Sequence, residues 1–256
     1  MKIIKINVDA GHGSNTAGKR TPPMPTSIDV DGDGVHDIKK GEQYREHIAN
    51  VGVASFLLEE LRRCGFETNQ TGFDDDNAMD DIDEALSARQ RAIVKANCDY
   101  SVSVHFNAYG DGKSFNSAEG IGIYIHNQYI EQSERLAKVV LKHLSGGSSQ
   151  KNRGITKKSL AMCNCNNMDV KAAILVELAF MTNLDEATKL MANKEYWKES
   201  AVEICKGICE YTGIKYVPEK SVMYKVQVGA YTIKKNAERL SLELEKLGYT
   251  NIIVEA

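Results

Sequence analysis

The sequence lacks the features that mark membrane proteins, disulfide-rich domains and nucleic-acid-binding proteins. No segment approaches the ~18 consecutive apolar residues that a membrane-spanning helix needs. The formal net charge is −3 over 256 residues, so no excess of positive charge is available to bind a phosphate backbone. The six cysteines, at positions 64, 98, 163, 165, 205 and 209, show no framework spacing. We therefore expect no membrane segment, no nucleic-acid partner and no disulfide bond.

Short β-branched segments alternate with segments of helical periodicity over most of the chain. The pattern predicts strands at residues 3–8, 100–104, 120–126 and 172–176, and helices at 46–64, 82–97, 132–144 and 195–211. This alternation is typical of an α/β domain with a mostly parallel sheet that is flanked by helices on both faces. We place this domain at residues 1–213, followed by a linker at 214–221. Residues 222–256 show a strand, helix and strand pattern, which predicts a small βαβ unit.

Residues that could do chemistry stand at the ends of predicted strands and at the beginning of a predicted helix. His12 and His105 each follow a strand, and Glu46 lies in the first turn of a predicted helix. Ligands of α/β sheets bind at the carboxyl ends of the strands. Two imidazoles and one carboxylate are the ligand set of catalytic zinc sites, which keep a fourth position open for water. From the spacing alone, purely structural histidines remain the alternative.

A second carboxylate, Glu177, follows the apolar run Ala173-Ile174-Leu175-Val176. Amide hydrolysis needs a group that accepts a proton from water and returns it to the departing nitrogen. Because apolar surroundings disfavour the charged form of a carboxyl group, we expect the pKa of Glu177 to be raised.

Four segments carry a resemblance to a known family. They are VDAGHG at 8–13, Glu46 with Asn50 four residues later, SVHFNA at 103–108 and VELAFMTN at 176–183. In this order they resemble the motifs of N-acetylmuramoyl-L-alanine amidases of the Amidase_3 type. Arg89 and Asn97 also resemble positions on the family's helix before the second histidine. The resemblance covers residues 1–213.

The resemblance implies a role for each candidate residue. His12, Glu46 and His105 would bind zinc, Glu177 would be the catalytic acid/base, and Asn107 in the third motif would contact substrate. The implied reaction is hydrolysis of the amide bond between N-acetylmuramic acid and L-alanine of the peptidoglycan stem peptide. The implied partner is peptidoglycan, and the implied cofactor is Zn.

The long insertion at residues 14–42 departs from the family pattern. It leaves Glu42 as a rival to Glu46 for the metal, and we prefer Glu46 because Asn50 and a helix follow it. Within the insertion, the acidic residues from Asp29 to Asp37 resemble the start of a calcium loop, but Lys40 stands where a bidentate glutamate belongs. We interpret this stretch as a solvated acidic loop. Whether the insertion gates the site or binds an ion stays open.

The segment YKVQVGAY at 224–231 and the following Asn236-Ala237 resemble one repeat of the SPOR type, known for binding glycan strands. The segment amounts to about half of a SPOR domain, which would leave a sheet edge and an apolar face uncovered. We therefore predict a homodimer through residues 222–256. A strict monomer in sedimentation at micromolar concentration would contradict it.

Two other functions compete with a peptidoglycan amidase. One is a peptidoglycan-binding protein with little catalysis, and the other is a zinc hydrolase that acts on a different amide. The N-terminal segment shows no signal-peptide pattern. We therefore expect synthesis in the cytoplasm and action on the cell wall after release, as an endolysin freed by a holin or as an enzyme freed by lysis or mother-cell rupture.

Overall fold

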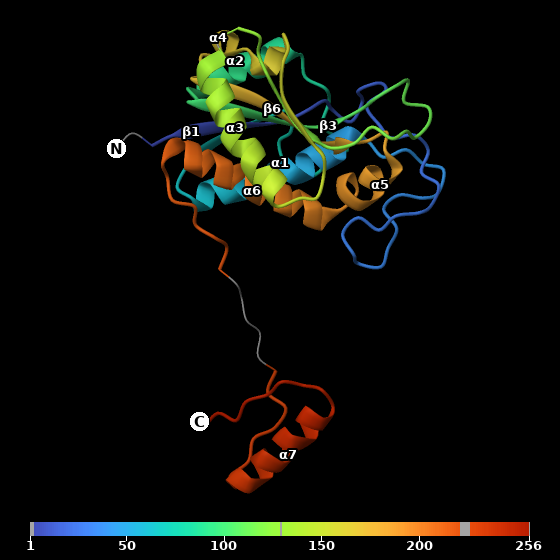
Figure 1. The fold of residues 1–256 in the computed structure, drawn as a ribbon, viewed down its shortest axis with the longest axis vertical. Helices are drawn as coiled ribbons and strands as arrows, with labels where there is room; N and C mark the ends of the chain where they lie inside the picture. Colours follow the sequence, from blue (N-terminus) through green and yellow to red (C-terminus); the bar gives the residue numbers. More distant parts are fainter. Residues whose placement is uncertain (1–2, 129, 221–225, 256) are drawn as a thin grey trace. The chain divides into compact units, whose positions relative to one another are not determined.

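The computed structural model describes residues 3–128, 130–220 and 226–255 (Figure 1). The chain divides into two compact units, one ending at Pro218 and one beginning at Glu219. Among the described residues, no helix combines the length and the apolar character needed to cross a membrane.

The large unit is built around one six-stranded sheet in the order β2-β1-β3-β6-β4-β5. Its strands are β1 (Lys5–Ala10), β2 (Glu67–Thr71), β3 (Tyr100–Asn107), β4 (Ile121–Ile125), β5 (Asn152–Lys157) and β6 (Ala172–Phe180). Neighbouring strands are parallel except β4 and β6, which run antiparallel. The predicted fold class, a mostly parallel sheet between helices, is thus confirmed.

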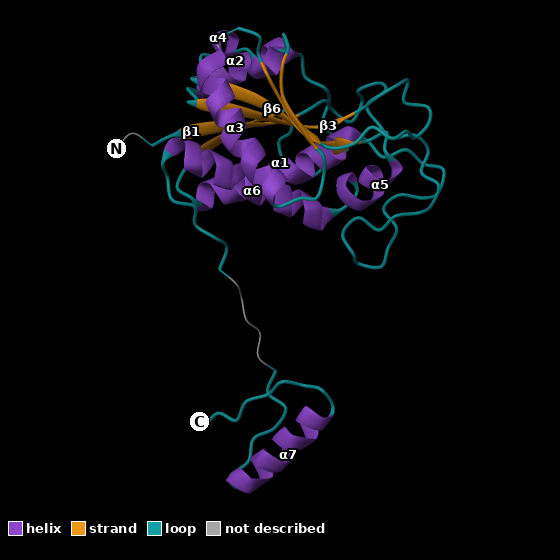
Figure 2. Cartoon of the chain, in the orientation of Figure 1, coloured by secondary structure: helices purple, strands orange, loops and turns teal. Residues whose placement is uncertain are grey.

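Helices cover both faces of this sheet (Figure 2). The helices of the large unit are α1 (Glu46–Arg63), α2 (Leu86–Ala96), α3 (Ile130–Gly146), α4 (Cys165–Met168), α5 (Leu184–Glu186) and α6 (Lys194–Thr212), with short η1 (Ala161–Cys163) and η2 (Ala187–Met191). Helices α1, α3 and α6 pack together on one face, whereas α2, α4 and η1 lie on the other.

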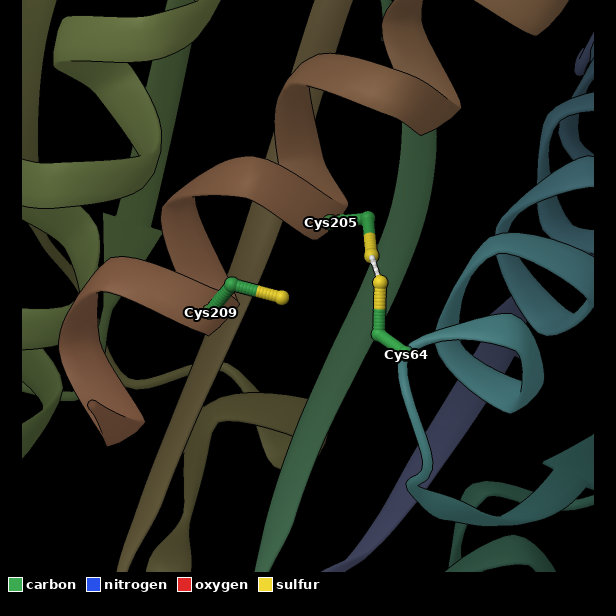
Figure 3. Close-up of side chains that lie close together, drawn as sticks. All are labelled: Cys64, Cys205 and Cys209. Atoms are coloured by element: carbon green, nitrogen blue, oxygen red, sulfur yellow. Dashed lines mark hydrogen bonds between the residues drawn. The ribbon is translucent and has the colours of Figure 1, made fainter. Parts of the chain in front are cut away.

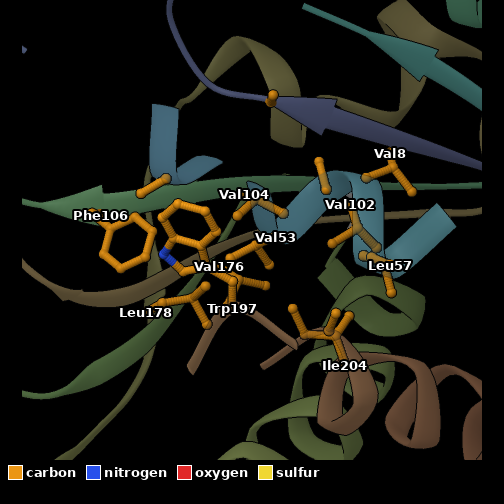
Figure 4. Close-up of a cluster of buried hydrophobic side chains, with 14 of the residues drawn as sticks. Val8, Val53, Leu57, Val102, Val104, Phe106, Val176, Leu178, Trp197 and Ile204 are labelled. Carbon is orange, nitrogen blue, oxygen red and sulfur yellow. The ribbon is translucent and has the colours of Figure 1, made fainter. Parts of the chain in front are cut away.

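The two faces of the sheet have different chemistry because side chains alternate along each strand. Val102, Val104 and Val176 face α1 and α6, where they join a large apolar core with Trp197 (Figure 4). The alternate positions on β1, β2 and β3 are polar and buried, and they hydrogen-bond to one another across the strands. These residues are Asn7, Asp9, Thr71, Ser101 and Ser103.

Strands β2 and β5 were absent from the sequence-based prediction. The β2 sequence, ETNQT, has no apolar alternation, and β5 is an edge strand whose residues are exposed or half-buried. Each strand is defined by its hydrogen bonds to a neighbour, β1 and β4 respectively. Such pairing leaves little trace in local composition.

The insertion at 14–42 is irregular, as predicted, but it is anchored to the large unit. Met24, Val30 and Ile38 are buried in the main apolar core. An antiparallel bridge pairs Ile28 with Ile38, and a second pairs Arg20 with Arg45. The insertion therefore has fixed points at both ends of its acidic stretch.

In the small unit, α7 (Lys234–Lys246) forms where a helix was predicted. The two strands predicted around it are not formed at residues 226–231 and 249–254, and residues 222–225 lie outside the described residues. A strand needs a neighbour to accept its backbone hydrogen bonds. In this unit Tyr249 N–H instead donates to the Leu244 carbonyl oxygen at the end of α7.

Candidate active site

Neighbouring strands bring the predicted site residues to one end of the sheet. His12 follows β1, His105 lies near the end of β3, and Glu177 lies in β6. His105 and Glu177 are register partners on adjacent parallel strands, so their side chains leave the same face of the sheet. Glu46 is the first residue of α1, where its negative charge is favoured by the helix dipole.

His12, Glu46 and His105 form a compact cluster whose ligand atoms all lie within 4.8 Å of one another. Glu46 lies between the two imidazoles, with Oε2 at 3.2 Å from His12 Nε2 and Oε1 at 3.1 Å from His105 Nδ1. The two rings meet edge to face, with centroids 4.9 Å apart. The competing carboxylate, Glu42, is exposed and accepts a hydrogen bond from the Lys39 backbone N–H. The fold therefore places Glu46, and not Glu42, against the histidines.

The polar atoms of this cluster fit a cation. His12 Nε2 and Glu46 Oε2 are buried, and although they are close together they lack hydrogen-bond geometry and have no other partner among the described residues. His105 Nε2 lies 3.1 Å from Ser103 Oγ. If Nε2 donates there, the lone pair of Nδ1 faces the Glu46 carboxylate, which requires a second proton or a metal ion on Nδ1. A metal ion would satisfy all three residues at once.

The electrostatics of the cluster follow from burial and proximity. Burial lowers the pKa of His12. Burial also acts to lower the pKa of His105, but the hydrogen bond and charge of Glu46 outweigh it, so this pKa is raised. Burial acts to raise the pKa of Glu46, but its contacts with His105 and His12 outweigh burial, so this pKa is lowered. Glu46 is thus held as a carboxylate, the form that binds metal.

Glu177 has a different environment. Burial raises the pKa of its carboxyl group to about 8, with a further contribution from the nearby Glu46 charge. Its Oε2 has no hydrogen-bond partner among the described residues. A carboxyl group with a pKa near neutrality can both accept and return a proton, as a general acid/base must.

The loop that carries His12 has a backbone conformation that needs support. His12 has φ 67°, in the left-handed region that non-glycine residues seldom adopt. The guanidinium of Arg89, on α2, donates to the carbonyl oxygens of Ala10 at 2.6 Å and of His12 at 2.5 Å. Asn50 donates to the Gly11 carbonyl oxygen at 3.0 Å. Neighbouring elements on both faces therefore hold this loop.

Gly11 is required by close approach rather than by its φ angle. A Cβ atom at this position would lie 2.1 Å from the His105 ring. Any side chain at Gly11 would displace His105 from the cluster.

A hydrogen-bonded chain fixes the orientation of His105. Ser103 Oγ donates to Asp9 Oδ2 at 2.5 Å, and His105 Nε2 lies against Ser103 Oγ. Asp9 is itself paired with Arg89 at 3.1 Å, and each is only 1% exposed. Such partners behind a ligand set its tautomer and its direction.

The cluster borders a cavity of about 440 Å³, lined by residues that include His12, His105, Leu86 and Met162. Asn107, predicted to contact substrate, lines a separate hollow of about 370 Å³ beside Lys151 and Arg153. Its Oδ1 accepts the Ala108 backbone N–H at 2.8 Å. The structure thus keeps Asn107 at the same end of β3 as His105 but outside the main cavity.

A family model for N-acetylmuramoyl-L-alanine amidases (Amidase_3) matches residues 6–210, most of the chain. The chain belongs to this family. It is therefore an amide hydrolase by descent, and the resemblance seen in its four motifs is confirmed.

Two curated relatives are similar over nearly the whole chain. The N-acetylmuramoyl-L-alanine amidase CwlM of Bacillus licheniformis is 23% identical, with 98% of this chain and 85% of that protein covered. The sporulation-specific N-acetylmuramoyl-L-alanine amidase of Bacillus subtilis (strain 168) is 24% identical, with the same coverage.

Solved structures share the fold of this Amidase_3 chain. An N-acetylmuramoyl-L-alanine amidase from Clostridium difficile 630 has a TM-score of 0.63 at 23% identity, covering 83% of this chain and 98% of that chain. The catalytic domain of CwlV from Bacillus (Paenibacillus) polymyxa has a TM-score of 0.62 at 20% identity, covering 83% of this chain and all of that domain.

Sequence reasoning missed several residues that support the site. His47 lies outside the cluster, yet it is fully buried and its ring contacts the Gly11 carbonyl oxygen at 2.8 Å and Asp81 at 2.8 Å. Asp9 and Ser103 could have been found, because each stands two or three residues before a candidate histidine on a strand. Asp81 carries no such signal, since it lies in an irregular segment far along the chain.

We expect Arg89→Met to destabilise the enzyme by about 3–5 kcal/mol, because it leaves the buried Asp9 carboxylate without its counter-charge. Urea unfolding followed by circular dichroism measures the change. Arg91→Met is the matched control, since Arg91 lies exposed on the same helix. Equal stability of the two variants would contradict a supporting role for Arg89.

Proposed function

We propose that this chain is a zinc-dependent N-acetylmuramoyl-L-alanine amidase that cleaves peptidoglycan between muramic acid and the L-alanine of the stem peptide. The observation that carries the proposal is the cluster of His12, Glu46 and His105, with its two buried unpartnered atoms, beside Glu177. The names of the curated relatives supply the substrate.

In this proposal His12, Glu46 and His105 hold the zinc ion, since two imidazoles and a carboxylate leave a position open for water. Bound zinc would lower the pKa of water to about 7 and polarise the substrate carbonyl group. Asp9 and Ser103 keep His105 Nε2 engaged, which leaves Nδ1 free to act as the ligand atom.

Glu177 moves the proton. Its carboxylate form accepts a proton from the attacking water, and its acid form then delivers this proton to the nitrogen of L-alanine as the amide bond breaks. Burial suits the residue to this task because it stabilises the protonated form between the two transfers. The pairing of Glu177 with His105 across β3 and β6 holds the carboxyl group on the side of the metal ligands.

Digestion of purified peptidoglycan tests the proposal directly. We expect soluble stem peptides with a free L-alanine amino group, identified by mass spectrometry, and intact glycan strands. A chelator should stop the release and added zinc should restore it. Cleavage within the glycan or inside the peptide would assign the chain to another hydrolase class. Binding without cleavage by zinc-loaded protein would favour the wall-binding alternative.

Three single substitutions separate the roles of the carboxylates. Glu177→Gln should keep the zinc ion and lower turnover by about 10²–10⁴-fold, because the proton carrier is lost. Glu46→Gln should lose zinc, as measured by atomic emission after dialysis. Glu42→Gln is the control, and it should keep both zinc and turnover because its side chain is exposed. Zinc loss in Glu42→Gln with retention in Glu46→Gln would reverse the ligand assignment.

We further propose that the enzyme is made in the cytoplasm, reaches the wall from inside a lysing cell, and binds glycan through its small unit. The support for a role in lysis is that 98% of this chain aligns, at 24% identity, with a sporulation-specific amidase. The support for glycan binding is the SPOR-like sequence at 224–231. Cells that lack the protein should release fewer spores or phage particles, and an unchanged amount of release would contradict a role in lysis.

A further inference from the structure

We propose that Cys64, Cys205 and Cys209 form a second metal site, for a thiophilic divalent ion such as zinc, separate from the proposed catalytic site. All three side chains are buried, and their sulfur atoms lie within 4.8 Å of one another. Cys64 follows α1, and Glu46 begins it. Because a helix rises about 1.5 Å per residue, the two sites lie about 27 Å apart along α1.

Two helices bring the thiols together. Cys64 is the C-cap residue of α1, and Cys205 and Cys209 lie one turn apart on the same face of α6. Helices α1 and α6 pack against each other on the apolar side of the sheet. Figure 3 shows the Cys205 and Cys64 side chains pointing toward each other, with Cys209 directed into the same space.

The spacing of the sulfurs suits a metal ion better than a disulfide bond. Cys205 Sγ and Cys64 Sγ are 3.8 Å apart. Two sulfurs that each lie about 2.3 Å from a tetrahedral zinc ion are separated by about 3.8 Å. A disulfide bond would require them to approach to about 2.05 Å.

The negative ends of two helices meet at the thiols, and they would attract the metal ion of the site. Cys64 lies at the C-terminal end of α1, and Cys209 lies in the last turn of α6, where the helix dipoles are negative. The Glu60 carboxylate is 4% exposed and lies one turn before Cys64 on α1. Its Oε2 is paired with Arg63 and accepts a hydrogen bond from Tyr216, so a water molecule is the candidate for a fourth ligand. The Val217 backbone N–H donates to Cys64 Sγ at 3.3 Å, a contact that stabilises a thiolate.

Ion binding would be linked to proton release. Burial raises the pKa of Cys64, and a hydrogen bond with Cys209, together with burial, raises that of Cys205. The same hydrogen bond lowers the pKa of Cys209. A metal ion must displace the thiol protons, as in structural cysteine sites.

A metal ion at this site would join residues 214–217 to helices α1 and α6. Arg63 Nε donates to the Val217 carbonyl oxygen, Tyr216 donates to Glu60, and Ile214 N–H donates to the Cys209 carbonyl oxygen. Residues 214–217 thus lie against the ends of α1 and α6. Buried cysteines that act only as small apolar side chains would pack there equally well, and metal binding separates the two interpretations.

Cobalt substitution of the full chain tests the proposal, because the proposed catalytic site offers only nitrogen and oxygen ligands. We expect reduced protein loaded with cobalt(II) to show a sulfur-to-cobalt charge-transfer band from about one ion per chain. Cys64→Ser/Cys205→Ser/Cys209→Ser should abolish the band. Cys98→Ser, which alters a buried thiol elsewhere in the large unit, should retain it.

A single variant guards against misfolding of the triple variant. Cys209→Ser should weaken cobalt binding by more than about 100-fold, because loss of an outer-shell partner alone costs about 10- to 100-fold. Peptidoglycan cleavage should be unchanged. The proposal is overturned if the wild type shows no such band while all six thiols titrate as reduced. It is also overturned if the band survives in the triple variant, or if mass mapping finds a Cys64–Cys205 disulfide in its place.

Discussion

The ion pair between Asp9 and Arg89 holds the candidate active site together. Both side chains are almost completely buried, so each needs the other as its counter-charge. Through Arg89 the pair reaches two carbonyl oxygens of the loop that carries His12, and through Asp9 it reaches Ser103 and then His105. One buried pair thus positions a residue from each of two neighbouring strands.

One face of the sheet forms the apolar core, and the other carries the polar residues that lead to the candidate active site. On one face, β-branched residues of β1, β3 and β6 pack against α1, α3 and α6 and provide most of the apolar burial. On the other face, polar residues of β1, β2 and β3 form a hydrogen-bonded layer that ends at His105. A buried polar layer is stable only when its members satisfy one another, so it also fixes where each one lies.

Helix α1 links the histidine-bearing cluster to the cysteine-bearing cluster. Its first residue, Glu46, presents a carboxylate between two imidazoles, and its C-cap residue, Cys64, faces two thiols of α6. An acidic group is favoured at the beginning of a helix and a cation at its end. Glu46 in the first turn of α1 and Arg62 and Arg63 in its last turn follow this rule.

Much of this description was accessible from the sequence, since hydrophobic periodicity and turn residues are local properties. They predicted most helices and strands, the α/β class and the irregular insertion at 14–42, and four short motifs separately carry the family resemblance. Only the tertiary structure decided the rest, because the contacts join residues far apart in the chain. The choice of Glu46 over Glu42 depends on which carboxylate reaches two histidines from other strands. The strand β2 depends on its pairing with β1, and the meeting of Cys64 with Cys205 depends on how α1 packs against α6. In the small unit the strand-like composition of residues 226–231 did not produce a strand, because a strand requires a hydrogen-bonded neighbour that local sequence cannot supply.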